Sequence, residues 1–254
     1  MLLRPTDEGL LAIGQTSHAW ISGQLARVWG NAEFGAVVPR EEICLAAEQH
    51  DVGMAEWDRH PQLDPETSRP RDFMHLPVGL HLALWRAAPG KLLTQSAYAA
   101  LLCSMHGVAL QRFRDLDAIP AADADDVRAF LVEQRVFQDR LRAQLGRDEA
   151  EVERNQQLIW TWDALSLAIC LDWAPYTQRD VPAAGGGAVE LRLLPDDLGG
   201  GHSLDPWPFV TDTVTVHAEG RILRPDTFAD EAELHAALLD APLRRLTFSL
   251  RPRR

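Results

Sequence analysis

The chain has 254 residues, with 37 acidic and 25 basic side chains and a formal net charge of −12 at pH 7. This length can bury a hydrophobic core without a partner, and the acidity excludes a general nucleic-acid binder, which needs clustered lysines and arginines. No apolar run is long enough to span a membrane, and Asp7 and Glu8 interrupt the apolar segment that a signal peptide needs, so we expect a cytoplasmic protein.

Apolar residues recur at helical spacing from about residue 15 to residue 173. Thr16 or Ser17 can cap a first helix that runs to Gly30, and Pro39 opens a second helix that ends near Gly53. Residues 54–76 contain three prolines and are expected to form a loop, and loops of that length are often functional. Further helices are expected over residues 77–90, 92–113, 122–146 and 148–173.

The composition changes at the segment PAAGGGAVE, residues 182–190. Beyond it, alternating apolar residues predict strands over 188–194, 212–218 and 243–252, with a helix over 229–239. We therefore expect a mainly α fold in two parts. Residues 1–183 would form a helical bundle, and residues 184–254 would form a small C-terminal α+β appendage.

The three cysteines, Cys44, Cys103 and Cys170, lie far apart within apolar helical patterns and have no CxxC spacing. An odd, scattered set of this kind is not a disulfide framework. We expect three buried free thiols.

Four successive predicted helices each carry one histidine on their apolar face. A single histidine in such a place is more often a hydrogen-bonded core residue than a ligand. Four of them would each need a partner, because an unsatisfied buried polar group costs on the order of 1–3 kcal/mol. One shared metal centre would satisfy them together. The four residues are His18, His50, His81 and His106.

Two aspartates could complete such a centre. Asp51 follows His50 directly, where the second helix is expected to fray before Gly53, so both side chains could reach one cation or two adjacent cations. From the last helix, either Asp163 or Asp172 could face inward but not both, because nine residues place them on opposite sides. Asp163 shares a stripe with apolar residues and is the preferred ligand, with Asp172 as the alternative.

In chain order these residues resemble the ligand set of the HD-domain superfamily, an all-helical fold named for its adjacent His and Asp. In its dinuclear members the ligands run His, His–Asp, His, His, Asp from successive helices. The segment WDALSL around Asp163 is similar to the closing motif of that superfamily. The resemblance implies an HD-like helical bundle over the helical part, with the metal ligands His18, His50, Asp51, His81, His106 and Asp163.

Nearly the whole chain resembles more closely a bacterial family catalogued as domain of unknown function 3891. The segments that carry this resemblance are QTSHAWISGQLARVWG, EQHDVGMAEWDRHPQLDPETSRPRDF, LLCSMHG and PWPF. The loop after Asp51 lacks the Gly-x-Pro element common in HD-type signalling phosphodiesterases, which argues against a cyclic dinucleotide as substrate.

Imidazole and carboxylate ligands suit Fe, Mn, Zn, Co or Ni, and two such ions about 3.5–4 Å apart can activate a hydroxide and hold a phosphoryl group. The resemblance implies that Asp51 bridges the ions, with His18, His50 and Asp163 on one and His81 and His106 on the other. Asp58 is a second candidate catalytic residue, for proton transfer to the leaving group. Arg69 and Arg71 could bind a substrate phosphate through their guanidinium groups, or could pair with Asp64 and Asp72.

We therefore expect a metal-dependent phosphohydrolase that acts on a small phosphate ester or nucleotide through a metal-bound hydroxide. One alternative is a di-iron oxygenase, because some HD-fold proteins use the same ligand set to activate dioxygen. Another is a non-catalytic module in which the pocket binds a ligand or stabilises the fold. The partner expected in each enzymatic case is a small molecule and not a membrane or nucleic acid.

Overall fold

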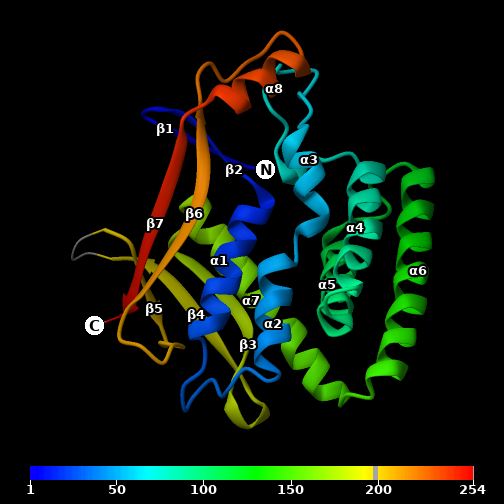
Figure 1. Cartoon of the computed structure of the whole chain (residues 1–254), viewed down its shortest axis with the longest axis vertical. Coiled ribbons are helices and arrows are strands. Elements are labelled where there is room, and N and C mark those ends of the chain that lie inside the picture. Colours follow the sequence, from blue (N-terminus) through cyan, green and yellow to red (C-terminus); the bar gives the residue numbers. More distant parts are fainter. Residues whose placement is uncertain (197–199, 254) are drawn as a thin grey trace.

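The computed structural model describes residues 1–196 and 200–253 (Figure 1). The strands are β1 (Leu2–Thr6), β2 (Gly9–Ile13), β3 (Tyr176–Pro182), β4 (Ala188–Pro195), β5 (His202–Asp205), β6 (Val214–Leu223) and β7 (Leu243–Pro252). The α-helices are α1 (Gln15–Val28), α2 (Arg40–Gln49), α3 (Ala55–Arg59), α4 (Val78–Leu93), α5 (Ala97–Leu110), α6 (Ala121–Leu145), α7 (Glu149–Leu171) and α8 (Glu231–Asp240). Short 3-10 helices cover Val52–Met54, Phe73–His75, Gln111–Phe113 and Ala184–Gly186.

The strands of the described residues form one curled, seven-stranded sheet in the order β1-β2-β6-β7-β5-β4-β3. The β5–β7 pair is parallel and the other neighbouring pairs are antiparallel. The N-terminal hairpin joins the sheet through β6 from the far end of the chain, with Leu10 opposite Leu223 and Ile13 opposite Gly220. The sheet is therefore mixed and takes strands from both ends of the sequence.

Helices α1 and α7 lie against the sheet, and α4, α5 and α6 lie on their far side (Figure 1). Alternate residues of β6 are buried, so that Val214, Val216 and Ala218 face the helices as a half-buried strand requires. Trp29, directly after α1, packs edge-to-face against Trp162 of α7, with ring centroids 5.7 Å apart. This core holds α1 and α7 side by side, which sets the distance between the polar side chains that they carry.

The expectation of a mainly α bundle with a small appendage is wrong, because the sheet is a major layer of the fold. Four strands were not predicted from the sequence: β1, β2, β3 and β5. Each has seven residues or fewer and weak alternation. On one side, β2 and β5 pair with strands distant in sequence, β6 and β7. The division at residue 183 stays a prediction, although β1 and β2 share their sheet with strands beyond it.

Helix α4 continues through Pro89 and ends at Leu93, so the predicted helix end at residue 90 is wrong. A proline removes one backbone hydrogen bond from a helix interior. Here Pro89 is buried beside Ala88 in the final turns, where packing retains the helical path. The predicted helices at 122–146 and 148–173 agree with α6 and α7, and the Asp148 carboxylate accepts a hydrogen bond from the backbone N–H of Glu151 at the start of α7.

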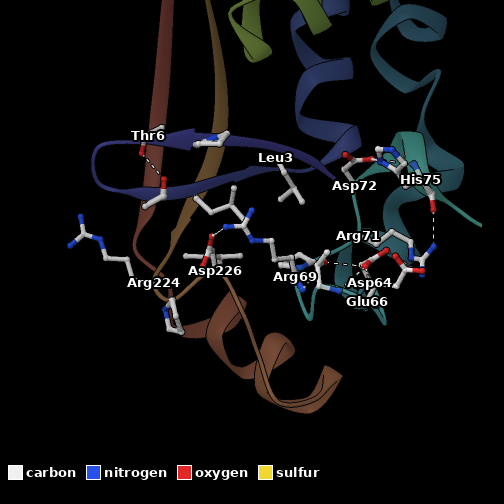
Figure 2. Close-up of a pocket in the computed structure, with 17 residues that line it drawn as sticks. Leu3, Thr6, Asp64, Glu66, Arg69, Arg71, Asp72, His75, Arg224 and Asp226 are labelled. Carbon is white, nitrogen blue, oxygen red and sulfur yellow. Dashed lines mark hydrogen bonds and ion pairs between the residues drawn. The ribbon is translucent and has the colours of Figure 1, made fainter.

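Residues 54–76 are more structured than the loop that the prolines predict. They contain α3 and the 3-10 turn at Phe73–His75, and an isolated bridge joins Leu63 to Pro70. The segment lies beside the β1–β2 hairpin and the residues after β6 (Figure 2). The Ser68 carbonyl accepts a hydrogen bond from the backbone N–H of Phe228, which ties this segment to the C-terminal part of the chain.

The three cysteines are buried free thiols, as expected. None of the described helices combines the length and the apolar character that a membrane span requires.

Candidate metal centre

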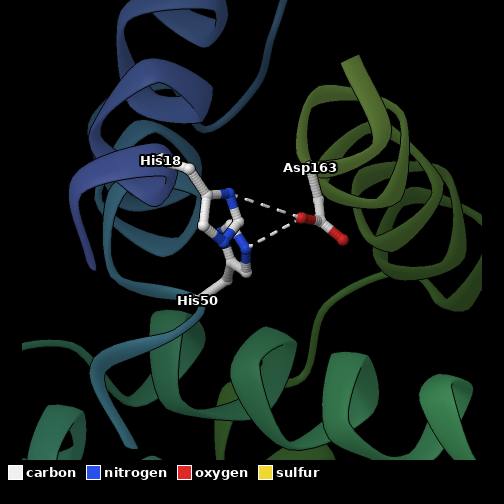
Figure 3. Close-up of side chains that lie close together, drawn as sticks. All are labelled: His18, His50 and Asp163. Carbon is white, nitrogen blue, oxygen red and sulfur yellow. Dashed lines mark ion pairs between the residues drawn. The ribbon is translucent and has the colours of Figure 1, made fainter. Parts of the chain in front are cut away.

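Three buried side chains meet where α1, the end of α2 and α7 approach one another (Figure 3). His18 lies on the buried face of α1 with Ile21 and Leu25, and Asp163 lies on the buried face of α7. His50 is the residue at which α2 ends, since Asp51 leaves the helical conformation with φ −98° and ψ 17°. The irregular helix end lets adjacent residues turn toward the same space.

Two histidine nitrogens lie close to one Asp163 oxygen. His50 Nε2 is 3.3 Å from Asp163 Oδ1, and His18 Nδ1 is 3.8 Å from the same oxygen. One possible ligand atom from each of the three residues lies within 4.8 Å of the other two. Exposure is 1% for His18, 0% for His50 and 7% for Asp163, so this group is shielded from bulk water.

Hydrogen bonds to Nδ1 orient both imidazoles, and in His18 this Nδ1 is also the nitrogen nearest to Asp163. His50 Nδ1 donates to the Ala47 carbonyl oxygen at 2.8 Å. His18 Nδ1 lies 2.9 Å from Ser166 Oγ. Ser166 donates its own hydrogen to the Asp163 carbonyl at 2.8 Å, so its oxygen accepts from His18. In each neutral imidazole Nε2 is therefore the nitrogen with the lone pair, which is how a metal-binding histidine is commonly held.

Asp51 adds a second carboxylate to the same place. Its Oδ2 is 2.8 Å from His18 Nε2 and 3.7 Å from His50 Nε2. A lone pair facing a carboxylate is unfavourable, so a cation must stand between them, either a proton or a metal ion. His50 Nε2 is fully buried, and although it lies 3.3 Å from Asp163 Oδ1 it forms no well-aligned hydrogen bond with any described residue. The donor set therefore fits a divalent cation.

The electrostatics of these residues are those of a cation site. Burial raises the pKa of a carboxyl group, but the facing histidines outweigh burial and hold the pKa of Asp51 and of Asp163 below the ordinary value. Burial would lower the pKa of His50, but the charges of Asp51 and Asp163 raise it to about 9. Two ionised carboxylates thus require positive charge at this point.

His106 lies at the edge of the group. Its Nε2 is 3.5 Å from Asp163 Oδ2, and its ring centroid is 4.8 Å from that of His50. Burial lowers the pKa of His106 to about 4, so the ring is neutral at physiological pH. Its Nδ1 has no hydrogen-bond partner among the described residues.

His81 lines the small cavity beside this site, but its two ring nitrogens contact Trp85 and Arg114. Its Nε2 accepts a hydrogen bond from the Trp85 indole N–H at 3.0 Å, and Arg114 lies 3.5 Å from its Nδ1. Burial, with the positive charge of Arg114, lowers the pKa of His81 to about 4. Trp85 is held in place by Gly107, where a Cβ atom would lie only 2.6 Å from the indole ring.

The cavity beside these residues has a volume of about 70 Å³. Besides the site residues, its wall is mostly apolar and includes Met54, Phe73 and Leu167. Gly53 brings this wall close to α4, because a Cβ atom there would lie 2.6 Å from the Leu84 carbonyl oxygen. The cavity can hold a few water molecules and the reacting group of a substrate, and little more.

The alternative ligand Asp172 lies outside the group. It ends α7 in the left-handed conformation with φ 58°, and its side chain is 72% exposed. Its nearest ionisable partner is His202, whose Nε2 is 3.8 Å from Asp172 Oδ1. Of the two candidates on α7, the structure places only Asp163 beside His18 and His50.

Asp58 makes structural contacts with both of its carboxylate oxygens. Oδ1 lies 2.7 Å from the Met1 ammonium group, and Oδ2 accepts a hydrogen bond from the backbone N–H of Gln15. That N–H is one of the unpaired donors at the start of α1, so Asp58 caps this helix from a distance. Burial raises the pKa of Asp58. Gln15 lines the metal cavity, so Asp58 positions a residue of the cavity wall.

Arg69 and Arg71 lie in a separate groove of about 730 Å³ between the β1–β2 hairpin and the segment after β6 (Figure 2). Arg69 forms an ion pair with Asp226. Arg71 donates to the His75 carbonyl oxygen at 3.0 Å and lies 4.0 Å from Asp64. Neither arginine is among the described residues that line the metal cavity, and both hold the 60–76 segment in place.

The hydroxyl groups that support His18 were not predicted from the sequence. Ser22 donates to the Trp162 carbonyl oxygen or to Ser166 Oγ, at 3.2 and 3.1 Å. Ser22 follows His18 by four residues and Ser166 follows Asp163 by three, so each shares a helix face with a ligand. This helical spacing is the sequence pattern from which the roles of Ser22 and Ser166 could have been predicted.

A model of the family described as "Protein of unknown function (DUF3891)" matches residues 1–225, so the chain belongs to this family. The match covers the candidate metal centre and ends before α8 and β7. No curated protein and no solved structure matches the chain.

Proposed function

We propose that this protein is a metal-dependent hydrolase that acts on a small phosphate ester. The observation that carries the proposal is the convergence of two oriented imidazoles and two ionised carboxylates beside a cavity. A structural site would surround its ion with protein ligands, whereas a catalytic site keeps a position free for water or substrate. His18, His50 and Asp163 would hold the ion, with Asp51 as a further ligand.

A bound divalent ion would lower the pKa of a water molecule and polarise a phosphoryl oxygen. Asp51 and Asp163 remain ionised and hold positive charge in the site. His106 is neutral and its Nδ1 has no hydrogen-bond partner in the part of the chain that the structure describes, so it can accept a proton or a hydrogen bond. Since the cavity is small, only the reacting phosphoryl group would enter it, and the rest of the ester would lie outside.

The choice of a phosphate ester is supported by the resemblance of the ligand order to the HD-domain superfamily. The expectation of two ions also comes from that resemblance. A second ion would require His81 to release the indole N–H of Trp85, because that contact occupies His81 Nε2. We propose one ion at His18, His50 and Asp163 as the minimum, with the second ion dependent on a new orientation of His81.

An iron-dependent oxygenase is the second candidate. Two histidines and one carboxylate with open positions are also the ligands of non-haem iron enzymes that use dioxygen. The mostly apolar wall of the small cavity favours a small uncharged molecule. This candidate differs from the first in its metal and in its consumption of oxygen.

Both candidates can be tested with one set of proteins. The wild type, Asp163→Asn and Asp172→Asn are loaded separately with Mn²⁺, Zn²⁺ or Fe²⁺. Each is then assayed for phosphate release from p-nitrophenyl phosphate and from nucleoside 5′-phosphates, and for oxygen uptake with the iron form. The hydrolase proposal expects metal-dependent phosphate release that is lost in Asp163→Asn and kept in Asp172→Asn. Oxygen uptake without phosphate release would replace it by the second candidate, and neither activity in a metal-loaded protein would favour a binding module.

A further inference from the structure

A second groove, of about 840 Å³, lies between α6, α7, the 3-10 turn after α5, and the start of β3. Its volume is within the range of small-molecule sites, which is roughly 300–1,000 Å³. No described residue lines both this groove and the metal cavity. The two are linked by one ring contact, because Trp160 lines the groove and its ring centroid is 5.5 Å from that of His106.

The groove contains an exposed aromatic platform. The rings of Phe113 and Trp160 are stacked, with centroids 5.5 Å apart and an interplanar angle of 14°. Phe113 is 76% exposed, so one face of its ring contacts Trp160 and the rest faces water. An exposed pair of stacked rings is a surface on which another planar ring can stack.

The charge of the groove is opposite to that of the whole chain. Four arginines line it, Arg112, Arg135, Arg142 and Arg179, against two carboxylates, Glu153 and Asp180. The chain as a whole has a net charge of −12. A local excess of guanidinium groups in an acidic protein attracts an anionic ligand selectively to that place.

Two of the four arginines have no polar partner among the described residues. Arg142 forms ion pairs with Glu149 and Glu153, and Arg179 lies 3.7 Å from Glu190. Within residues 1–196 and 200–253, by contrast, Arg112 and Arg135 form no ion pair and no side-chain hydrogen bond. One is at the end of the α5 segment and the other on α6, so they stand on different elements of the groove.

We propose that this groove binds a planar aromatic anion of the nucleoside 5′-phosphate class. The base would stack on the Phe113–Trp160 platform, and Arg112 and Arg135 would bind the phosphate. A guanidinium group suits a phosphate because it donates two parallel hydrogen bonds. A long nucleic acid is a poor occupant, because the acidic remainder of the surface repels it. The inference does not depend on the metal centre or on its chemistry.

The test is titration of the metal-free protein with AMP, followed by isothermal calorimetry and tryptophan fluorescence. Variants are Phe113→Ala, the double change Arg112→Gln with Arg135→Gln, and the control Arg128→Gln, which removes an exposed arginine of α6 outside the groove. We expect binding by the wild type and the control, a loss of about tenfold or more in Phe113→Ala, and a comparable loss in the double variant. Adenosine and inorganic phosphate should each bind more weakly than AMP.

The variant Asp163→Asn distinguishes AMP binding in this groove from AMP binding at the metal centre. The groove proposal expects AMP to bind this variant as it binds the wild type. Loss of AMP binding in Asp163→Asn would place the nucleotide at the metal centre and overturn the inference. So would undetectable AMP binding by the wild type, or equal affinity in the wild type, Phe113→Ala and the double arginine variant. Circular dichroism of each variant, compared with the wild type, checks that the fold is kept.

Discussion

Metal affinity at the His18, His50 and Asp163 site is expected to rise steeply with pH. In the metal-free protein the charges of Asp51 and Asp163 raise the pKa of His50 to about 9, so this imidazole is protonated at pH 7. A metal ion needs the lone pair of Nε2, so its binding must release that proton. The apparent Kd should therefore fall about tenfold from pH 7 to pH 8 and about 50-fold from pH 7 to pH 9, or about 2.3 kcal/mol.

The assay is calorimetric titration with Mn²⁺ at pH 7, 8 and 9, in buffers of different ionisation enthalpy that report proton release. We expect about one proton released for each ion at pH 7 and a fraction that declines toward pH 9. The folding stability of the metal-free protein should change with pH in the opposite direction to the metal affinity. The raised pKa of His50 stabilises the fold in full below its unfolded pKa of about 6.5. That stabilisation is lost as pH rises through about 9. A Kd that does not change between pH 7 and pH 9, without proton release, would refute the account.

Two further substitutions test the support of the site. Ser166→Ala removes the acceptor of the His18 Nδ1–H and should weaken Mn²⁺ binding by roughly 10–100-fold; Ser104→Ala, which loses a buried hydrogen bond to Gln134 instead, should leave the Kd unchanged. Equal Kd values in both variants would show that Ser166 does not orient the ligand. Trp162→Ala removes a fully buried ring that packs on Trp29 and should lower the free energy of unfolding by about 3–5 kcal/mol in urea. The partly exposed Trp20→Ala should cost far less, and an equal loss would contradict the packing described.

The helices of this protein could be predicted from local patterns, and much of the sheet could not. Helices α6 and α7 have clear apolar periodicity and charged or capping residues at their ends, which are properties of the segment itself. Strand β2 instead pairs with β1 on one side and joins the rest of the sheet through β6, from the other end of the chain. No local pattern encodes such a distant partner, so the size of the sheet was missed.

Part of the candidate site followed from the same local reasoning. His18 and Asp163 share helix faces with buried apolar residues, and these faces do turn toward each other. The contact that occupies His81 was overlooked, although Trp85 lies four residues on along the same helix face and donates to its Nε2. The placement of Arg69 and Arg71 depended on Asp226 and the β1–β2 hairpin, which no spacing within the loop reveals.

We propose that His18, His50 and Asp163 hold a metal ion, and the metal content of the purified protein is the simplest check of that site. The wild type, Asp163→Asn and Asp172→Asn are purified without chelator or nickel resin and analysed for transition metals. We expect at least one equivalent of metal per chain in the wild type and in Asp172→Asn, because the Asp172 side chain is exposed, and a large loss in Asp163→Asn. Equal metal content in the two variants, or none in the wild type even after metal is added, would contradict it.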